Sequence, residues 1–347
     1  MLLLPDLRIR NYRLFEDFAL ERLARVNLIA GRNNVGKSAL LEAAYLVGSQ
    51  DPYGALLRIL GERGERAEGS KEGLLSALFL HYRLTPESRI EIHAGSRWFR
   101  LCSDPDERTL KRILAESETD KEIVLLLRLE TSAENQPFHL PVNAEGMAEV
   151  IRPPRRWGYT PDRTFWIRGA VSLYHRYKEL STWWDEIALT PQADLVIEIL
   201  RIIEPGLQAI DFLSRRENVK VRLAGMGQPI FIGSLGDGLQ HLLMIAVALA
   251  KATEGLLLLD EVETGLHFSV LVDLWRLLFR AARQRDVQVI ATTHSGDCIA
   301  AFCQVWSEVE EHDGAYYRLD RVDNRILPEH YSLEELRLAV EGGIETR

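Results

Sequence analysis

Apolar runs alternate with amphipathic segments over the second half of the chain. The runs at 256–261 and 287–295 are apolar until their last residues, which is typical of strands buried on both faces. Around them, apolar positions recur with a helical period over 239–255, 268–286 and 296–312. Because strands that alternate with helices form parallel sheets, this half of the chain predicts a sheet covered by helices on both faces.

The first fifty residues follow a different pattern. Apolar and polar positions alternate over 6–21, with a turn near Asn11, which predicts a strand or a hairpin. A short apolar strand is expected over 25–31, and a helix over 37–48 that stops at Gly48. A strand, a glycine-containing turn and a helix in this order are the context that a phosphate-binding turn requires.

The middle of the chain predicts strands first and helices after them. A charged, glycine-rich loop over 61–73 precedes the strands, and the stretch 152–161, rich in proline and arginine, is the clearest internal boundary. Strands are expected over 78–84, 89–94, 97–102 and 122–130, helices over 174–189 and 191–205, and hairpins over 219–234 and 315–331, before a last helix over 332–343. We interpret 1–347 as a single domain. Within it, 50–215 is an insertion, and 216–347 contains the later motifs and the C-terminal hairpin and helix.

The turn after the strand 25–31 reads GRNNVGKS, which matches the phosphate-loop pattern. Backbone N–H groups of such a loop surround phosphates at a helix N-terminus, the lysine reaches the β- and γ-phosphates, and the hydroxyl binds Mg²⁺. The alternative is a chance glycine turn. The motif predicts a site for ATP and Mg²⁺ made by Gly31, Asn33, Asn34, Gly36, Lys37, Ser38 and Ala39.

Two further strand ends carry candidate chemistry. The run of four leucines ends in Asp260 and Glu261, which places an acidic pair at the sheet edge where α/β proteins bind ligands. Asp260 is expected to bind Mg²⁺ and Glu261 to orient or deprotonate the attacking water. The strand 287–295 brings His294 to the same edge, where it can contact the γ-phosphate. The alternatives are a charged turn and an ordinary strand-end histidine.

A glycine-rich turn at Gly236, Asp237 and Gly238 opens a long apolar helix, and helix N-termini bind anions. Since it lies far from the phosphate loop in sequence, it can meet the nucleotide of another subunit. A zinc site made by His294 with Cys298 and Cys303 is a weaker alternative, because it lacks enough ligands on one helix face.

Composition limits the kinds of partner and the locations that are expected for this chain. Hydrophobic residues make up 46% of the chain, without an uncharged apolar run long enough to cross a membrane and without a signal-peptide pattern at the start. Three cysteines favour a reducing, cytoplasmic location. The net charge of −9 requires any DNA contact to be local. The candidate is the arginine-aromatic stretch 151–168, above all Arg155, Arg156 and Trp157; alternatively, its aromatic side chains pack into the core and its arginines are solvated.

In this order, the motifs GRNNVGKS, GDG before an apolar helix, DEVETGLH and QVIATTHS resemble those of ABC-type ATPases. The version here is similar to the SMC/RecF branch, and within it to the ATPases of OLD (overcoming lysogenization defect) nucleases, often called AAA family ATPases. The resemblance covers about 1–50 and 230–300 and implies a P-loop NTPase fold of ABC-like architecture. That fold is α/β, a mixed central sheet flanked by helices, with antiparallel strands and a helical insertion.

The resemblance also implies how the motifs work. Such ATPases form head-to-tail homodimers that hold two ATPs between the phosphate loop of one subunit and the signature of the other. Asp260 and Glu261 then form the Walker B pair, His294 the switch histidine, and 263–267 the loop that crosses to the partner. The chain departs from the family at Gly236, which replaces the usual signature serine; Ser234 is a possible substitute. Gln50 is a weak candidate for the Q-loop.

The implied function is an ATP-gated dimeric switch that hydrolyses ATP and acts with DNA or a separate nuclease or effector, in DNA repair or anti-phage defence. The segment after His294 is too short for the TOPRIM nuclease domain of OLD proteins, so nuclease activity in cis is not expected. Two alternatives remain open: an ATP-dependent assembly or sensor module without DNA contact, and, less favoured, the ATP-binding subunit of a membrane transporter.

Overall fold

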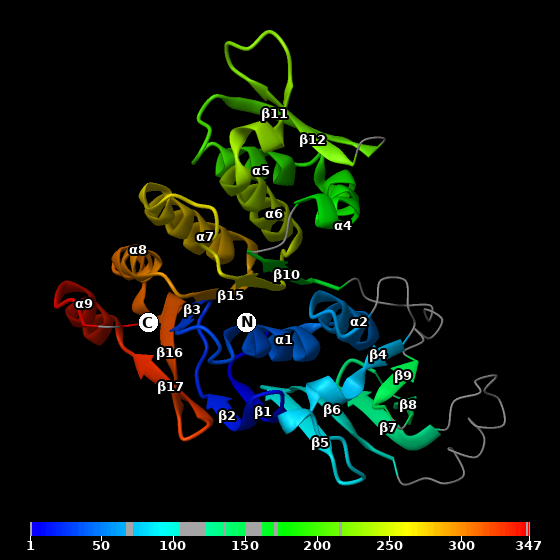
Figure 1. The fold of residues 1–347 in the computed structure, drawn as a ribbon. Helices are drawn as coiled ribbons and strands as arrows, with labels where there is room; N and C mark the ends of the chain where they lie inside the picture. Colours follow the sequence, from blue (N-terminus) through cyan, green and yellow to red (C-terminus); the bar gives the residue numbers. More distant parts are fainter. Residues whose placement is uncertain are drawn as a thin grey trace.

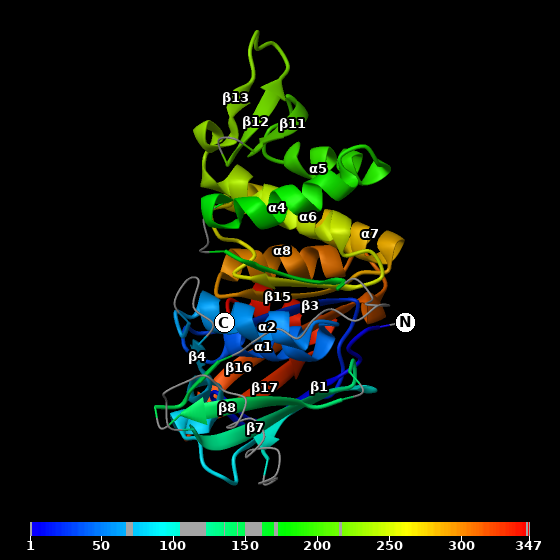
Figure 2. The ribbon, with the colours of Figure 1, turned by 90° about the vertical axis from the view of Figure 1, so that its right-hand side faces the viewer.

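The computed structural model describes residues 2–66, 72–104, 123–134, 136–143, 145–149, 162–169, 173–214, 217–344 and 346. Its elements lie in layers (Figure 1). An antiparallel sheet forms one side, two helices separate it from a mixed sheet, and a group of helices covers the opposite face of the mixed sheet. The view after a 90° turn shows the same order of layers (Figure 2).

The mixed sheet is the centre of the fold. Its strands lie in the order β10 (Thr164–Arg168), β14 (Leu256–Asp260), β15 (Gln288–Thr293), β3 (Val26–Gly31), β16 (Gly314–Val322) and β17 (Arg325–Tyr331). Neighbouring strands are parallel from β10 to β16, and only β17 pairs antiparallel. Parallel pairing brings the carboxyl ends of β14, β15 and β3 to one edge, as the sequence predicted.

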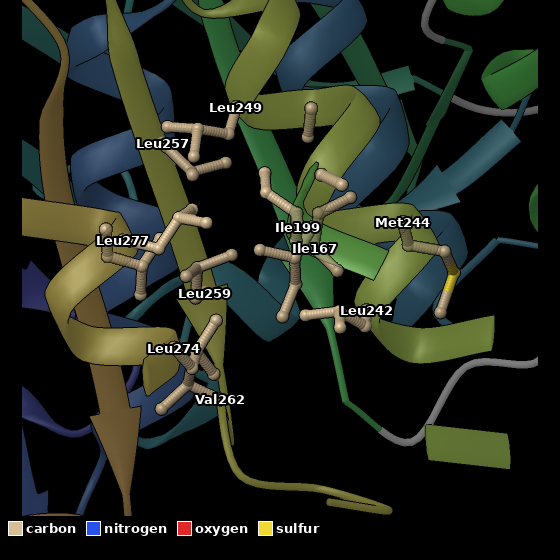
Figure 3. Close-up of a cluster of buried hydrophobic side chains, with 14 of the residues drawn as sticks. Ile167, Ile199, Leu242, Met244, Leu249, Leu257, Leu259, Val262, Leu274 and Leu277 are labelled. Carbon is tan, nitrogen blue, oxygen red and sulfur yellow. The ribbon is translucent and has the colours of Figure 1, made fainter. Parts of the chain in front are cut away.

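Alternate side chains of the central strands enter two separate cores. In β14, Leu257 and Leu259 pack with the upper helices, whereas Leu256 and Leu258 pack toward the other side. Figure 3 shows Leu257 beside Leu249 of α6 (Asp237–Lys251), and Leu259 on the side of Ile167. Since every one of these leucines is buried, the strand is apolar without alternation.

Helices cover both faces of this sheet. On one face lie α6, α7 (Leu271–Arg285) and α8 (Gly296–Trp306). On the other face α1 (Lys37–Gly48) and α2 (Pro52–Glu62) lie between the two sheets. The helix over 37–48 is confirmed with its predicted bounds.

The antiparallel sheet has eight strands and contains the N-terminal hairpin. Its order is β2 (Phe15–Leu20), β1 (Leu7–Tyr12), β5 (Arg89–Ala94), β6 (Arg97–Ser103), β7 (Ile123–Thr131), β8 (Phe138–Asn143), β9 (Met147–Glu149) and β4 (Glu72–Leu74). The predicted hairpin and three of the four predicted middle strands are therefore confirmed. The pairing of β1 with β5 joins segments about eighty residues apart, which no local pattern indicates.

The remaining elements extend from the upper helices and from the C-terminal side. Helices α4 (Leu173–Ile187) and α5 (Pro191–Leu200) pack on α6, next to a small sheet of β11 (Leu207–Leu213), β12 (Asn218–Leu223) and β13 (Ile230–Phe231). Helix α9 (Leu333–Glu341) begins with a capping box between Ser332 and Glu335. None of the described helices is both long and apolar enough to cross a membrane.

Two predicted elements are wrong. The strand expected over 78–84 is replaced by two 3₁₀ turns, η1 (Leu75–Leu78) and η2 (Leu80–Tyr82), because this segment bonds to the tip of the N-terminal hairpin and not to a ladder partner. The helix expected to run to Pro205 ends at Leu200, where turns begin. The C-terminal hairpin forms, but its first strand joins the central sheet beside β3.

Candidate nucleotide-binding site

The phosphate loop connects β3 to α1, as its motif predicts. Gly36 sits at the N-cap of α1 with φ 96°, a left-handed conformation that L side chains rarely adopt. A β-carbon there would also lie 3.0 Å from Cζ of Phe15, which belongs to the N-terminal hairpin. The hairpin thus packs directly on the loop, and only glycine fits at this position.

Lys37 is the first residue of α1 and its side chain is buried across the loop. Its Nζ donates to the carbonyl oxygens of Gly31 at 2.6 Å and Arg32 at 3.0 Å. Burial lowers the pKa of Lys37, and the nearby carboxylates of Asp260 and Glu261 oppose that shift. The ammonium is therefore held where phosphate oxygens can replace two backbone carbonyls as its acceptors.

The acidic pair at the end of β14 is set by a threonine on β15. The Thr292 hydroxyl donates to Oδ1 of Asp260 at 2.7 Å and accepts from the backbone N–H of Glu261 at 2.9 Å. Glu261 itself has φ 53°, the left-handed region that costs a residue other than glycine about 1 kcal/mol or more. One hydroxyl thus fixes both acidic residues where the strand turns out of the sheet.

His294 follows β15 and lies beside the acidic pair. Its backbone N–H donates to Oε1 of Glu263 at 3.1 Å, and its Nδ1 is 3.7 Å from Oε1 of Glu261. The Thr293 hydroxyl holds the same oxygen of Glu263 at 2.7 Å. The structure therefore brings His294 next to Glu261, although its ring stays about half exposed and outside the cavity described next.

A cavity of about 330 Å³ opens between the phosphate loop and the acidic pair. Eight predicted or motif residues line it: Asn33, Asn34, Gly36, Lys37, Ser38, Ala39, Asp260 and Glu261. Five residues that sequence reasoning missed complete the lining: Arg13, Leu14, Arg63, Glu65 and Tyr82. They come from three separate segments, so neither spacing nor a motif marks them as neighbours.

The donor set fits a magnesium ion held together with a nucleotide. Mg²⁺ prefers oxygen ligands and is usually bound by one or two carboxylates plus substrate phosphates. Ser38 offers a hydroxyl and Asp260 a carboxylate on the same cavity. Across the described ranges, no group of three or more His, Cys, Asp or Glu could hold a metal; water and phosphate oxygens would supply the other ligands of a magnesium ion. The same observation gives the zinc alternative at His294, Cys298 and Cys303 no support.

The signature turn, Gly236 to Gly238, does not line the cavity of its own chain. It lies against the crossing loop, residues 263–267, where a β-carbon on Gly238 would be only 2.3 Å from the carbonyl oxygen of Gly265. Gly236, Asp237 and Ser234 are exposed. The turn and the crossing loop thus pack against each other, separate from the lining of the cavity at the phosphate loop.

Two weaker expectations find less support. Arg155, Arg156 and Trp157 lie outside the described residues. In the described part of the stretch, Phe165 and Trp166 are buried in β10, which makes them core residues unable to stack on bases. Gln50 lies beside the guanidinium of Arg97 and is absent from the described lining of the cavity.

The match to a protein-family model decides the family of this chain. A family model described as "AAA domain, putative AbiEii toxin, Type IV TA system" matches residues 26–297, most of the chain. The chain belongs to this family. The match runs from β3 through the phosphate loop and the acidic pair to the start of α8. The AAA domain thus includes the carboxyl ends of β3, β14 and β15, and the chain is an ATPase-domain protein.

Individual relatives agree with this assignment. The chain is 23% identical to an "ATP/GTP phosphatase" of Helicobacter pylori over 368 aligned positions, covering 96% of this chain and 97% of that protein. A short segment, 12% of this chain and 5% of the relative, is 51% identical to the "DNA double-strand break repair Rad50 ATPase" of Archaeoglobus fulgidus.

Solved structures show the fold. An SMC head bound to the C-winged helix domain of ScpA superposes with a TM-score of 0.54 at 14% identity, over 96% of this chain and 99% of that one. A Pyrococcus furiosus Smc head domain gives 0.51 at 11% identity, over 99% of each chain. The ABC-like P-loop architecture, with its mixed sheet, antiparallel sheet and helices, is therefore confirmed.

Proposed function

We propose that this protein binds ATP with Mg²⁺ and hydrolyses it by attack of water on the γ-phosphate. The observation that carries the proposal is the meeting of Lys37, Ser38, Asp260 and Glu261 on one cavity. Two of these residues come from the phosphate loop and two from a strand more than two hundred residues later. The H. pylori relative named "ATP/GTP phosphatase" supports hydrolysis of a nucleoside triphosphate.

Each residue has a role that follows from its position. Lys37 offsets phosphate charge once it leaves the carbonyls of Gly31 and Arg32. Ser38 and Asp260 would hold Mg²⁺, which when bound neutralises charge on the phosphates. Glu261 accepts the proton of the attacking water, and catalysis is otherwise mostly positioning and charge neutralisation. His294, beside Glu261, senses the γ-phosphate.

The proposed working form is a head-to-tail homodimer. The signature turn is exposed and does not line the cavity of its own chain, so its helix N-terminus is available to the nucleotide of a partner. The crossing loop packs on the signature turn and is followed by Phe268, whose side chain is largely exposed. ATP would then close the dimer, and hydrolysis would open it.

ATP-dependent dimerisation tests this arrangement. The Glu261→Gln protein, which should hold ATP without rapid turnover, is expected to become a dimer with ATP·Mg²⁺ and to dimerise less without nucleotide, as measured by light scattering. If Ser234 replaces the missing signature serine, Ser234→Ala should weaken this ATP-dependent dimer. A permanent monomer would refute the sandwich, and a constitutive dimer would show that other elements join the subunits.

The biological setting is also a proposal. We place the ATPase with the OLD type, acting with DNA or with a separate nuclease or effector in repair or defence. A family description that names a toxin system and a partial match to a Rad50 repair ATPase support this setting.

A DNA contact by the arginine-aromatic stretch has a direct test. Replacing Arg155 and Arg156 by alanine should lower DNA affinity and reduce the slope of log affinity against log salt by about one per arginine. The reason is that fewer counterions are released on binding when fewer phosphates are contacted. ATP hydrolysis without DNA should be unchanged. Binding measured by fluorescence anisotropy across a salt series decides it, and an unaltered slope would remove this stretch as the contact.

A further inference from the structure

One wall of the nucleotide cavity is built by segments outside every motif. The tip of the N-terminal hairpin contributes Arg13 and Leu14, the turn after α2 contributes Arg63 and Glu65, and η2 contributes Tyr82. We call these five residues the outer wall. The backbone N–H of Arg13 donates to the carbonyl of Leu78 at 2.8 Å, which ties the hairpin tip to η1, directly before the turn that carries Tyr82.

The charged groups of the outer wall are bonded to one another and to Glu42. Glu42 is fully buried in α1 and accepts from Nε of Arg13 at 2.5 Å and from Nε of Arg63 at 2.6 Å. The Arg13 guanidinium also donates to both carboxylate oxygens of Glu65, at 2.8 and 2.9 Å. These charges are therefore engaged in holding the wall together.

The apolar surface of the outer wall is exposed. Leu14 is 38% exposed, and Tyr82 is 67% exposed although both line the cavity. His81 and Tyr82 both have φ 57°, so two consecutive residues other than glycine hold the turn in the left-handed region. Such backbone strain gathers at functional sites, where the surrounding contacts maintain it. An exposed aromatic ring on a strained turn, at the rim of a polar cavity, is suited to a flat apolar ligand group.

We propose that Tyr82, supported by Leu14, stacks on the nucleobase of the nucleotide whose phosphates lie at Lys37 and Ser38. This inference rests on the proposed ATPase function and extends it to substrate choice. Stacking tolerates every base because each has a π-face. The Arg13 guanidinium is engaged through all three of its nitrogens with Glu42, Glu65 and the carbonyl of Ala77, so it does not read the edge of a base. The site therefore accepts ATP and GTP with similar affinity.

Equilibrium binding with Mg²⁺ tests the proposal, using ATP, GTP and inorganic tripolyphosphate as probes. Tyr82→Ala is expected to lower the affinity for ATP and for GTP by about tenfold each, near the lower part of the range for loss of one base stack. The affinity for tripolyphosphate should stay unchanged. Tyr82→Phe should bind both nucleotides like the parent protein. Tyr174→Ala is the matched control, because Tyr174 is 66% exposed on α4, outside the lining of the cavity.

Several results would overturn this assignment. If Tyr82→Ala binds ATP like the parent while Lys37→Ala does not, the ATPase proposal stands and the stacking role fails. Equal weakening of tripolyphosphate would show that Tyr82 shapes the wall without touching a base. A preference of more than about 100-fold between ATP and GTP would require a group that reads the base edge. A parent protein that binds none of the three probes would remove the nucleotide site itself.

Discussion

Glu261→Gln is expected to slow ATP hydrolysis by about 100- to 1000-fold while ATP binding persists, since a general base contributes roughly that factor. A glutamine amide cannot accept the proton of the attacking water. The substitution keeps the backbone N–H bond to Thr292, the left-handed turn and the size of the side chain, so the cavity is preserved. Phosphate release and equilibrium nucleotide binding, measured on the same protein, separate the two effects.

Glu263→Gln is the matched control for this prediction. Glu263 lies as close to His294 as Glu261 does, 3.6 Å against 3.7 Å, but it is absent from the cavity lining. A glutamine there still offers an oxygen to Thr293, so hydrolysis should fall less than about tenfold, the scale of one neutral hydrogen bond. If the Glu261→Gln protein hydrolyses ATP at the full rate, Glu261 is not the base.

Lys37→Ala is expected to weaken ATP binding by about 100-fold or more, because a hydrogen bond to a charged group contributes about 1.5–3 kcal/mol and the lysine charge also offsets the phosphates. Hydrolysis at saturating ATP should fall as well, since the same charge stabilises the transition state. Isothermal titration with ATP·Mg²⁺ and with ADP measures the loss.

Thermal melting has to accompany the Lys37→Ala measurement. Without the ammonium, the carbonyls of Gly31 and Arg32 lose their donor, and the loop loses stability with it. Lys251→Ala, which removes a lysine that pairs with Glu186 outside the cavity, should bind ATP normally. Unchanged ATP affinity in a folded Lys37→Ala protein would contradict the assignment of the phosphate site.

The sequence alone already assigned Lys37 and Glu261 to the site, because each belongs to a local sequence pattern. A glycine turn between a strand and a helix is a contiguous motif, and Lys37 occupies a set place within it. Asp260 and Glu261 follow a strand too apolar to lie anywhere but in a buried sheet. Because parallel strands end at one edge, the sequence alone places these three distant segments together.

The outer wall could not be predicted in this way. Arg13, Glu42 and Glu65 meet only because the hairpin tip, α1 and the turn after α2 pack on each other, and no spacing between them indicates it. The 3₁₀ turns over 75–82 have the apolar content of a strand, yet the bond from Arg13 to Leu78 and the bridge from Tyr12 to Phe79 bind them to the hairpin. Tertiary contacts override a weak local preference there.

The sequence by itself determined the α/β class, the phosphate loop, the acidic strand end and the position of His294, because these depend on periodicity and on contiguous motifs. Only the tertiary structure decided that Trp166 belongs to the core, that β16 enters the central sheet beside β3, and that Tyr82 faces the nucleotide cavity. Each of those depends on which segments pair across long stretches of chain, and that choice is made by packing that local patterns do not encode.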